Sequence, residues 1–224
     1  MREVGIETFG GGPVRQVSDA IALGAGLVLQ GTRMRFKRNE EVFGEGEEAE
    51  YIYRVVSGAV RTVRFSSDGR RQILAFHLPG DVFGIEAGAQ HSLTAEALAD
   101  AEVALVRRSL IDAAAAQDIT AAQALIALMQ RQLLNAQEHA LILGHKGAGE
   151  RVASFLLQLG DRIAAKCEID LPMSRADIAD YLALTIETVS RAFTQMERDR
   201  TIALPSSRHV VVRDRYALEM LEAA

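Results

Sequence analysis

The sequence predicts an α+β fold in three parts: an N-terminal β-roll of the jelly-roll type, a long helix, and a C-terminal winged helix-turn-helix. Short apolar runs with glycine-rich turns fill residues 24–107, which is typical of many short strands. From Ser109 the chain is rich in Ala, Leu and Gln and has no Gly or Pro before Gly144, which is helical composition. We therefore expect an N-terminal arm at 1–23, the β-roll at 24–115, the long dimerisation helix at 116–145 and the winged unit at 146–224.

The composition limits the class of protein. The chain has 224 residues, of which 49% are hydrophobic and 25% charged, enough to bury a core in each of two modest domains. No apolar run approaches the roughly 20 residues that a bilayer span needs, and residues 1–12 lack the apolar core of a secretion signal. We expect a soluble cytoplasmic protein without a membrane partner.

The sequence carries no signature of catalysis or of a bound cofactor. Cys167 is the only cysteine, so an internal disulfide and a cysteine-held iron–sulfur or zinc site are excluded. A glycine-rich phosphate loop, a nucleophile elbow and a paired-histidine motif are also missing. We expect neither an enzyme nor a cofactor.

The charge balance gives little general attraction for nucleic acid. The net charge is −5, and residues 174–215 are close to neutral, with seven arginines against six carboxylates. DNA binding must therefore depend on where particular arginines lie.

The strands of the expected β-roll stand out between turns. Apolar runs cover residues 51–56, 59–65 and 73–76, and Ser57-Gly58, Ser67-Asp-Gly and Pro79-Gly-Asp lie between or after them. Between Val60 and Phe65, arginines alternate with apolar residues, as expected for strands.

The long helix carries an apolar seam at coiled-coil spacing. Its members repeat at intervals of 3, 4, 3, 4 and 3 residues and are Ile126, Met129, Leu133, Ala136, Ala140 and Leu143. We interpret this seam as a dimer contact, with Leu125, Leu128 and Leu141 on a neighbouring flank that covers the β domain. The alternative is one helix buried entirely against its own β domain. Gly144, Gly147 and Gly149 then predict a hinge before a second helical region near Glu150.

Two short helices with a tight turn follow. Ser174 is placed to cap the first helix, with Asp177 at the third position of a capping box, and the helix is expected to end near Leu182. Thr185 is placed to cap a second helix whose inward residues are Val189, Phe193 and Met196.

The opposite face of the second helix predicts DNA recognition. Ile186, Glu187, Ser190 and Arg191 lie near its N-terminus, where a recognition helix enters the major groove. The alternative is an ordinary solvated face with a Glu–Arg pair four residues apart. The hairpin expected at residues 201–213, around Pro205-Ser-Ser, favours a winged DNA-binding unit. The expected phosphate contacts are Ser174, Arg175, Thr185, Thr188, Ser206, Ser207, Arg208 and His209.

Residues 24–213 resemble the CRP/FNR regulator family. The resemblance is carried by Pro79-Gly-Asp-Val-Phe-Gly, the long helix and Ile186-Glu-Thr-Val-Ser-Arg. The Glu-x-x-Ser-Arg form is similar to the FNR branch, and Cys167-Glu-Ile-Asp-Leu-Pro-Met-Ser-Arg looks most like FixK-type regulators. The resemblance implies a cyclic-nucleotide-binding-like β-roll in a homodimeric activator. It also implies a palindromic double-stranded DNA site of the TTG-N8-CAA kind, RNA polymerase as a partner, and genes of low-oxygen respiration or nitrogen metabolism.

The chemistry of the recognition residues fits that site. Arg191 can donate two hydrogen bonds to guanine, Glu187 can accept one from cytosine or adenine, and Ser190 can meet a thymine. Ile186 stands where CRP proper has an arginine, so we expect a contact with a thymine methyl or no base contact.

The resemblance also shows what the β-roll lacks. His91 stands where cyclic-nucleotide binders have the phosphate-binding arginine, and neutral imidazole cannot replace a bidentate guanidinium. We therefore expect no cyclic AMP binding, and Glu86 is interpreted as a surface carboxylate. The N-terminal cysteines that hold the FNR cluster are absent. Two alternatives stay open: an effector-gated, for example haem-based, regulator of the same family, and a regulatory module of another class. The candidate haem ligands are His77, His91, His139 and His145.

Cys167 has two interpretations. It is either a small, partly buried residue or a redox switch, in which sulfinate or a glutathione adduct near DNA opposes the approach of phosphate. Lys166 favours thiolate character and Glu168 opposes it.

Overall fold

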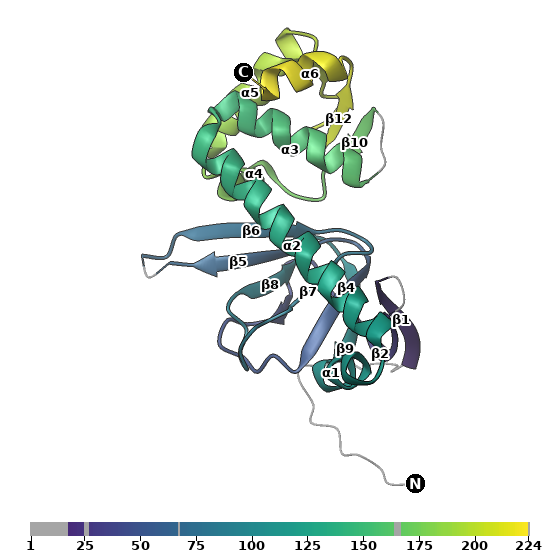
Figure 1. Cartoon of the computed structure of the whole chain (residues 1–224). Helices are drawn as coiled ribbons and strands as arrows, with labels where there is room; N and C mark the ends of the chain where they lie inside the picture. Colours follow the sequence, from purple (N-terminus) through teal and green to yellow (C-terminus); the bar gives the residue numbers. More distant parts are fainter. Residues whose placement is uncertain (1–17, 25–26, 67, 164–166, 224) are drawn as a thin grey trace.

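The computed structural model describes residues 18–24, 27–66, 68–163 and 167–223. It has a β-roll and a smaller C-terminal unit of helices with a short sheet, and one long helix runs between them (Figure 1). Among the described residues, no helix is long and apolar enough to cross a membrane.

The β-roll consists of two antiparallel sheets. A five-stranded sheet has the order β1-β2-β9-β4-β7, and a four-stranded sheet has the order β3-β8-β5-β6. Val55, Val60, Phe83 and Val103 are buried in the core of the roll. This confirms the expected β architecture. The strands are β1 (Ser18–Gly24), β2 (Leu27–Phe36), β3 (Glu41–Phe43), β4 (Tyr51–Ser57), β5 (Val60–Phe65), β6 (Arg71–His77), β7 (Val82–Phe83), β8 (Thr94–Ala97) and β9 (Ala101–Arg107).

The first strand begins earlier than expected. We predicted an N-terminal arm up to residue 23, but β1 pairs with β2 from Ser18 onward. Ile21 and Leu23 are buried while Ala22 is exposed, so the two-residue period of a half-buried strand starts before the predicted boundary. Residues 1–17 of the expected arm lie outside the described residues.

The helical stretch after the roll is two helices rather than one. Asp118 separates α1 (Arg108–Gln117) from α2 (Ile119–His145), and its carboxylate accepts the backbone N–H of Thr120 at 2.8 Å. Leu125 and Leu128 pack against the β-roll as expected. Leu141 does not, because α2 has by then passed beyond the roll toward the C-terminal unit (Figure 1).

The expected hinge is also shorter. Gly144 lies inside α2 and Gly149 inside α3 (Ala148–Arg162), so only Lys146 and Gly147 separate the two helices. Glu150 closes the junction, since its carboxylate accepts the backbone N–H of Gly147 at 3.0 Å. The glycines therefore do not form an extended flexible linker.

The C-terminal unit has the predicted helix-turn-helix and hairpin. Its helices α4 (Arg175–Leu182) and α5 (Ile186–Arg198) pack with α3 around Ile178, Leu182 and Phe193. Two elements were not predicted: strand β10 (Glu168–Asp170) and helix α6 (Arg215–Glu222). Strand β10 joins β11 (Ile202–Ala203) and β12 (His209–Val212) in a sheet of order β10-β12-β11.

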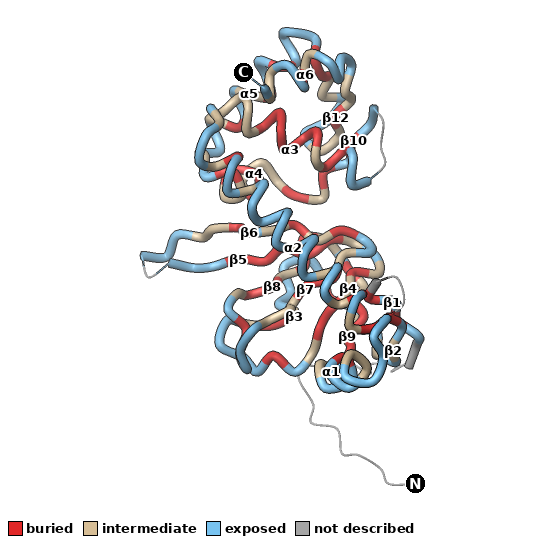
Figure 2. Tube along the Cα trace, in the orientation of Figure 1, coloured by how far each residue is buried: buried red, intermediate tan, exposed pale blue. Residues whose placement is uncertain are grey.

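The two parts share one apolar cluster. Ile73, Phe76 and Leu78 of the roll belong to the same buried cluster as Phe155 of α3. The Phe76 ring lies 5.0 Å from the ring of Tyr181 on α4, measured between centroids. Figure 2 shows buried segments of β6 facing those of the C-terminal unit. The helix-turn-helix therefore packs against the β5–β6 hairpin.

Candidate nucleic-acid interface

The first helix of the helix-turn-helix is held by a capping box. The Ser174 hydroxyl accepts the backbone N–H of Asp177 at 3.1 Å. In return, the Asp177 carboxylate accepts the backbone N–H of Ser174 at 2.9 Å and its hydroxyl at 2.7 Å. Ala183 then adopts a left-handed conformation, with φ of 51°, and turns the chain toward α5.

Helix α5 presents the predicted outer face. Thr185 caps it by accepting the backbone N–H of Thr188 at 3.2 Å. Because its inner residues are buried against α3 and α4, the face on the other side is directed to solvent. Four predicted base-contacting residues are exposed on this face: Ile186, Glu187, Ser190 and Arg191.

The acidic and basic groups of this face stay separate. Among the ion pairs of the described residues, none joins Glu187 to Arg191, so the alternative of a solvated Glu–Arg pair gains no support. Hydrogen bonds from its own backbone N–H and from Thr185, together with the charge of Arg191, hold the pKa of Glu187 below its usual range. Glu187 is therefore an ionised acceptor at the N-terminus of α5.

Two predicted phosphate contacts at α4 are engaged inside the unit. The Ser174 hydroxyl serves the capping box, and the Arg175 guanidinium lies 3.2 Å above the Phe193 ring centroid. Burial lowers the pKa of Arg175 to about 10, so the group is still charged near neutral pH. Its Nη1 atom is buried without a hydrogen-bond partner among the described residues. A contact from Arg175 to phosphate stays a prediction and requires this side chain to turn outward.

The wing is organised by Ser206. Its hydroxyl accepts the backbone N–H groups of Arg208 at 3.3 Å and His209 at 3.1 Å. The Arg208 guanidinium donates to the carbonyl of Pro172 at 3.4 Å, and the His209 ring lies 2.7 Å from the Asp170 carboxylate. Asp170 competes with phosphate for His209, so the expected contact of His209 also stays a prediction.

Two family models match the chain. A Crp-like helix-turn-helix domain matches residues 150–221, and a cyclic nucleotide-binding domain matches residues 33–118. The nitrogen fixation regulation protein FixK of Azorhizobium caulinodans is 50% identical over 198 residues, which cover 86% of this chain and 80% of that protein. The chain is a FixK-like regulator of the CRP/FNR family. FixK of Rhizobium meliloti is 41% identical to this FixK-like regulator over 83% of the chain and 85% of that protein.

The solved structures agree with this assignment. FixK2 from Bradyrhizobium japonicum superposes on the FixK-like regulator with a TM-score of 0.85 and 49% sequence identity, over 88% of this chain and 99% of that chain. The molecule is therefore a transcription regulator with a DNA-binding helix-turn-helix, as the sequence analysis predicted, and regulators of this family are not enzymes.

The predicted dimer seam of the FixK-like regulator is largely exposed to solvent on α2. Ile126, Met129 and Leu133 are 54%, 51% and 59% exposed. Ala136 and Ala140 are exposed too, whereas Leu143 is partly buried. Leu134, which is not part of the predicted seam, and Leu141, which was expected on the covered flank, are exposed as well. An exposed apolar strip of this extent on one helix is unusual for a surface that stays in water.

The β-roll of the FixK-like regulator places His91 inside. Its ring stacks on Phe43 with centroids 3.6 Å apart, and neither ring nitrogen hydrogen-bonds to another described residue. Burial lowers the pKa of His91 despite the nearby carboxylate of Glu86. Glu86 is partly buried rather than a surface group, and its carboxylate accepts the hydroxyl and the backbone N–H of Ser92. A neutral, stacked imidazole thus occupies this part of the roll.

Other histidines are also held by their neighbours. His77 lies 3.2 Å from the Thr62 hydroxyl, and burial lowers the pKa of His77 to about 4. The His139 ring stacks on Tyr181 with centroids 4.0 Å apart. Among the described residues, no group of three or more His, Cys, Asp or Glu side chains could hold a metal ion.

Cys167 is exposed and lies beside the wing. Its carbonyl accepts the backbone N–H of Val212 on β12 at 2.7 Å, and β10 begins at the next residue. The interpretation of a small, partly buried residue is therefore wrong, because the structure has Cys167 exposed. The redox interpretation stays a hypothesis.

Proposed function

We propose that this regulator acts as a homodimer that binds a TTG-N8-CAA-like palindrome and activates transcription by recruiting RNA polymerase. The observation that carries the proposal is the exposed outer face of α5. There, the ionised carboxylate of Glu187 lies one helical turn from the Arg191 guanidinium, which forms no ion pair with another described residue, at the end of α5 that we assign to the major groove. Among similar proteins, AadR of Rhodopseudomonas palustris, 37% identical, is described as a transcriptional activatory protein.

Each base contact has a specific chemical basis. Arg191 offers two parallel donors for O6 and N7 of guanine, and Glu187 offers an acceptor for the amino group of cytosine or adenine. Ser190 lies on the same face and is assigned to a thymine, while the Ile186 side chain is assigned to a thymine methyl. These four contacts together read one half-site.

A palindrome requires two copies of this surface related by a two-fold axis. The exposed seam on α2 supplies the contact that we assign to the homodimer, because burial of Ile126, Met129 and Leu133 against a second copy removes their apolar surface from water. Two recognition helices about 34 Å apart then meet successive major grooves on one side of the duplex.

We further propose that DNA binding needs neither cyclic AMP nor an iron–sulfur cluster. His91 supplies no fixed positive charge for a cyclic phosphate, since it is buried, stacked on Phe43 and shifted toward the neutral form. The chain has one cysteine, too few for a cysteine-held cluster.

A mobility-shift titration tests the proposal. We expect the purified protein, without added nucleotide, to bind a duplex with TTG-N8-CAA at least about a thousandfold more tightly than a scrambled duplex of equal composition, within the usual specificity range of such regulators. Equal retardation of both duplexes contradicts the proposed site. Retardation that appears only after cyclic AMP is added contradicts effector-independent binding.

We also propose redox control through Cys167, supported by its exposure beside the wing. With glutathione present, diamide takes up one hydrogen from the Cys167 thiol and one from the glutathione thiol. The two sulfur atoms then form a mixed disulfide. The adduct adds bulk and negative charge at the approach to DNA. We expect specific binding by the wild type to fall after this treatment and to recover with dithiothreitol.

The control is Cys167→Ser, which should keep its binding through the same treatment. Met173 and Met196 are buried, so they are poor competing targets for oxidation. If oxidised wild type and oxidised Cys167→Ser lose binding in parallel, or if native Cys167 does not react with iodoacetamide, the redox hypothesis is wrong.

A further inference from the structure

An arginine of the β-roll is buried against the first helix of the DNA-binding unit. Arg61 on β5 is only 7% exposed. Its Nη1 donates to Oδ1 of Asp177 on α4 at 2.8 Å, while Nε and Nη2 donate to Glu96 on β8 at 2.8 and 2.6 Å. One guanidinium therefore joins the sheet of the roll to the helix-turn-helix.

The neighbouring strand makes a second connection to the same helical turn. On β6, Arg71 donates from Nη2 to Asp177 at 2.9 Å and from Nε to Asp180 at 2.8 Å. Gln72 donates its side-chain amide to the carbonyl of Asp180 at 2.7 Å. Three side chains of the β5–β6 hairpin thus donate hydrogen bonds to α4, at two carboxylates and one backbone carbonyl.

Asp177 is the centre of this arrangement. Its Oδ1 accepts from both arginines, and its Oδ2 accepts from Ser174 in the capping box. Although burial opposes ionisation, the bonds from Ser174 and the charges of Arg61 and Arg71 hold the pKa of Asp177 below its usual range. Rotation of α4 away from the hairpin would leave a buried carboxylate without its cations, which is costly in a poorly solvated site.

The rest of the interface combines apolar packing with one further charged contact. The rings of Phe76, Phe155 and Tyr181 pack at 5.0 to 6.2 Å between centroids, and apolar packing depends on area more than on angle. Arg162 on α3 adds a polar contact, since it pairs with Asp81 and donates to the carbonyl of Phe76 at 2.9 Å. Charged hydrogen bonds specify one orientation even where their net contribution to stability is small.

We propose that Arg61 and Arg71 are positioning residues for DNA recognition: through Asp177 and Asp180 they fix the orientation of α5 relative to the dimer helix α2. The proposal rests on the proposed function, namely a homodimer on a palindrome. In such a dimer, the orientation of each helix-turn-helix on its roll sets the distance between the two recognition helices. Arg61 and Arg71 thereby set the half-site spacing that the regulator accepts.

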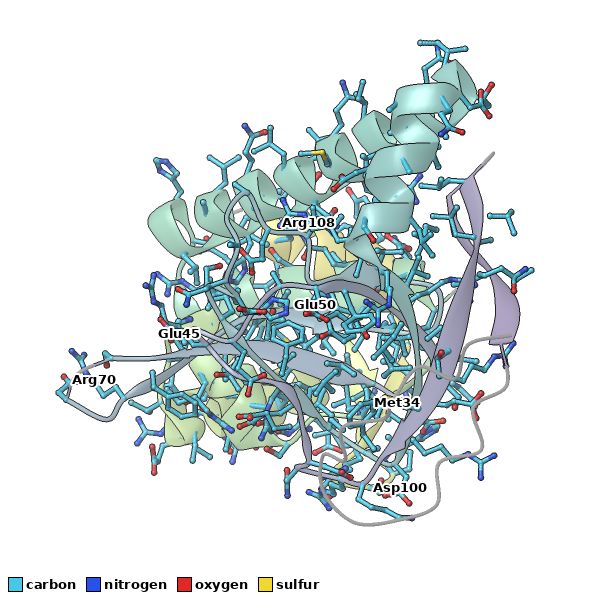
Figure 3. The ribbon with its side chains drawn as sticks, turned by 90° about the horizontal axis from the view of Figure 1, so that it is seen from below. Met34, Glu45, Glu50, Arg70, Asp100 and Arg108 are labelled. Carbon is cyan, nitrogen blue, oxygen red and sulfur yellow. The ribbon has the colours of Figure 1, made fainter. Side chains whose placement is uncertain are left out.

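The test variant is Arg61→Met, which removes the cation and keeps most of the stem. Arg71 still neutralises Asp177, so the cap of α4 is retained. The matched control is Arg64→Met on the same strand. The Arg64 side chain is 62% exposed, and its Nη2 lies 3.6 Å from Oε1 of Glu45 of the same roll. Among the ion pairs of the described residues, none joins Arg64 to α4. Figure 3 shows Glu45 and, at the tip of the hairpin, Arg70 at the edge of the β-roll.

The first readout is a series of duplexes with spacers of eight base pairs and of one or two base pairs more or fewer. For Arg61→Met we expect roughly tenfold weaker binding to the eight-base-pair spacer, within the range of couplings between sites. We also expect a flatter preference among spacers. Binding to a single half-site should be unchanged, Arg64→Met should match the wild type, and Arg61→Lys should fall between. A uniform loss on half-sites and full sites means damage to the helix-turn-helix itself and overturns the proposal.

The second readout does not depend on DNA. A spin label on Cys167, the only thiol, reports the distance between the two DNA-binding units of the full-length dimer. We expect a broader distance distribution for Arg61→Met than for the wild type and the Arg64→Met control. An unchanged distribution overturns the proposal, whereas failure of the wild type on the palindrome overturns the proposed function alone. If Arg61→Met does not fold, Arg71→Met gives the same comparison, because Arg61 then remains on Asp177.

Discussion

The double substitution Met129→Glu with Leu133→Glu is expected to weaken binding to the full palindrome by at least about a hundredfold, toward the non-specific level. Both side chains are more than half exposed on the seam of α2. Burying such a side chain in a dimer contributes about 1.5–3 kcal/mol if it is fully covered. The variant loses this contribution in both copies and places four carboxylates across the seam, so the dimer should dissociate.

Sedimentation and mobility shift together check this expectation. The matched control is Ala127→Glu with Arg131→Glu, which also adds two glutamates four residues apart. Positions 127 and 131 are exposed on the roughly opposite side of α2, as the 3.6-residue period requires. The control should remain dimeric and bind the palindrome. A monomeric seam variant that still binds the full site tightly would show that the seam assignment is wrong.

The helix-turn-helix could be predicted from the sequence because its determinants are local. A capping serine with Asp177 three residues later and apolar residues at helical spacing define α4 without reference to distant residues. The same holds for Thr185 and the buried face of α5. The break at Asp118 was missed because the composition on both sides is uniformly helical, and only the side-chain cap marks the start of α2.

The interface between the two parts could not be predicted. Arg61 looked like one of two arginines alternating with apolar residues on a strand, yet it is buried while Arg64 is exposed. The two arginines differ because Arg61 pairs with Asp177, which lies 116 positions further along the chain. Arg175 is a second case in which the sequence does not show a contact within the fold. As a basic residue at the start of a helix it suggests a phosphate contact, but the sequence pattern does not reveal that its guanidinium lies over the ring of Phe193.

For base readout, Arg191→Ala is expected to cost about 1–3 kcal/mol per half-site on the specific duplex. A bidentate contact to guanine is lost when the guanidinium is removed, and alanine leaves the helix itself intact. The loss on random DNA should be much smaller, because non-specific binding depends on the total of phosphate contacts rather than on one base contact. Titrations of both duplexes at one fixed salt concentration measure this difference.

Arg198 provides the matched control, because it is an exposed arginine in the last turn of the same helix, far from the end assigned to the groove. Arg198→Ala should weaken both duplexes slightly and equally. Glu187→Ala, in turn, should relax discrimination at the base paired with its assigned partner, which a base-substitution series at each position of the half-site measures. Equal weakening by Arg191→Ala on specific and random DNA would make Arg191 a phosphate contact, and unchanged discrimination by Glu187→Ala would remove Glu187 from base recognition.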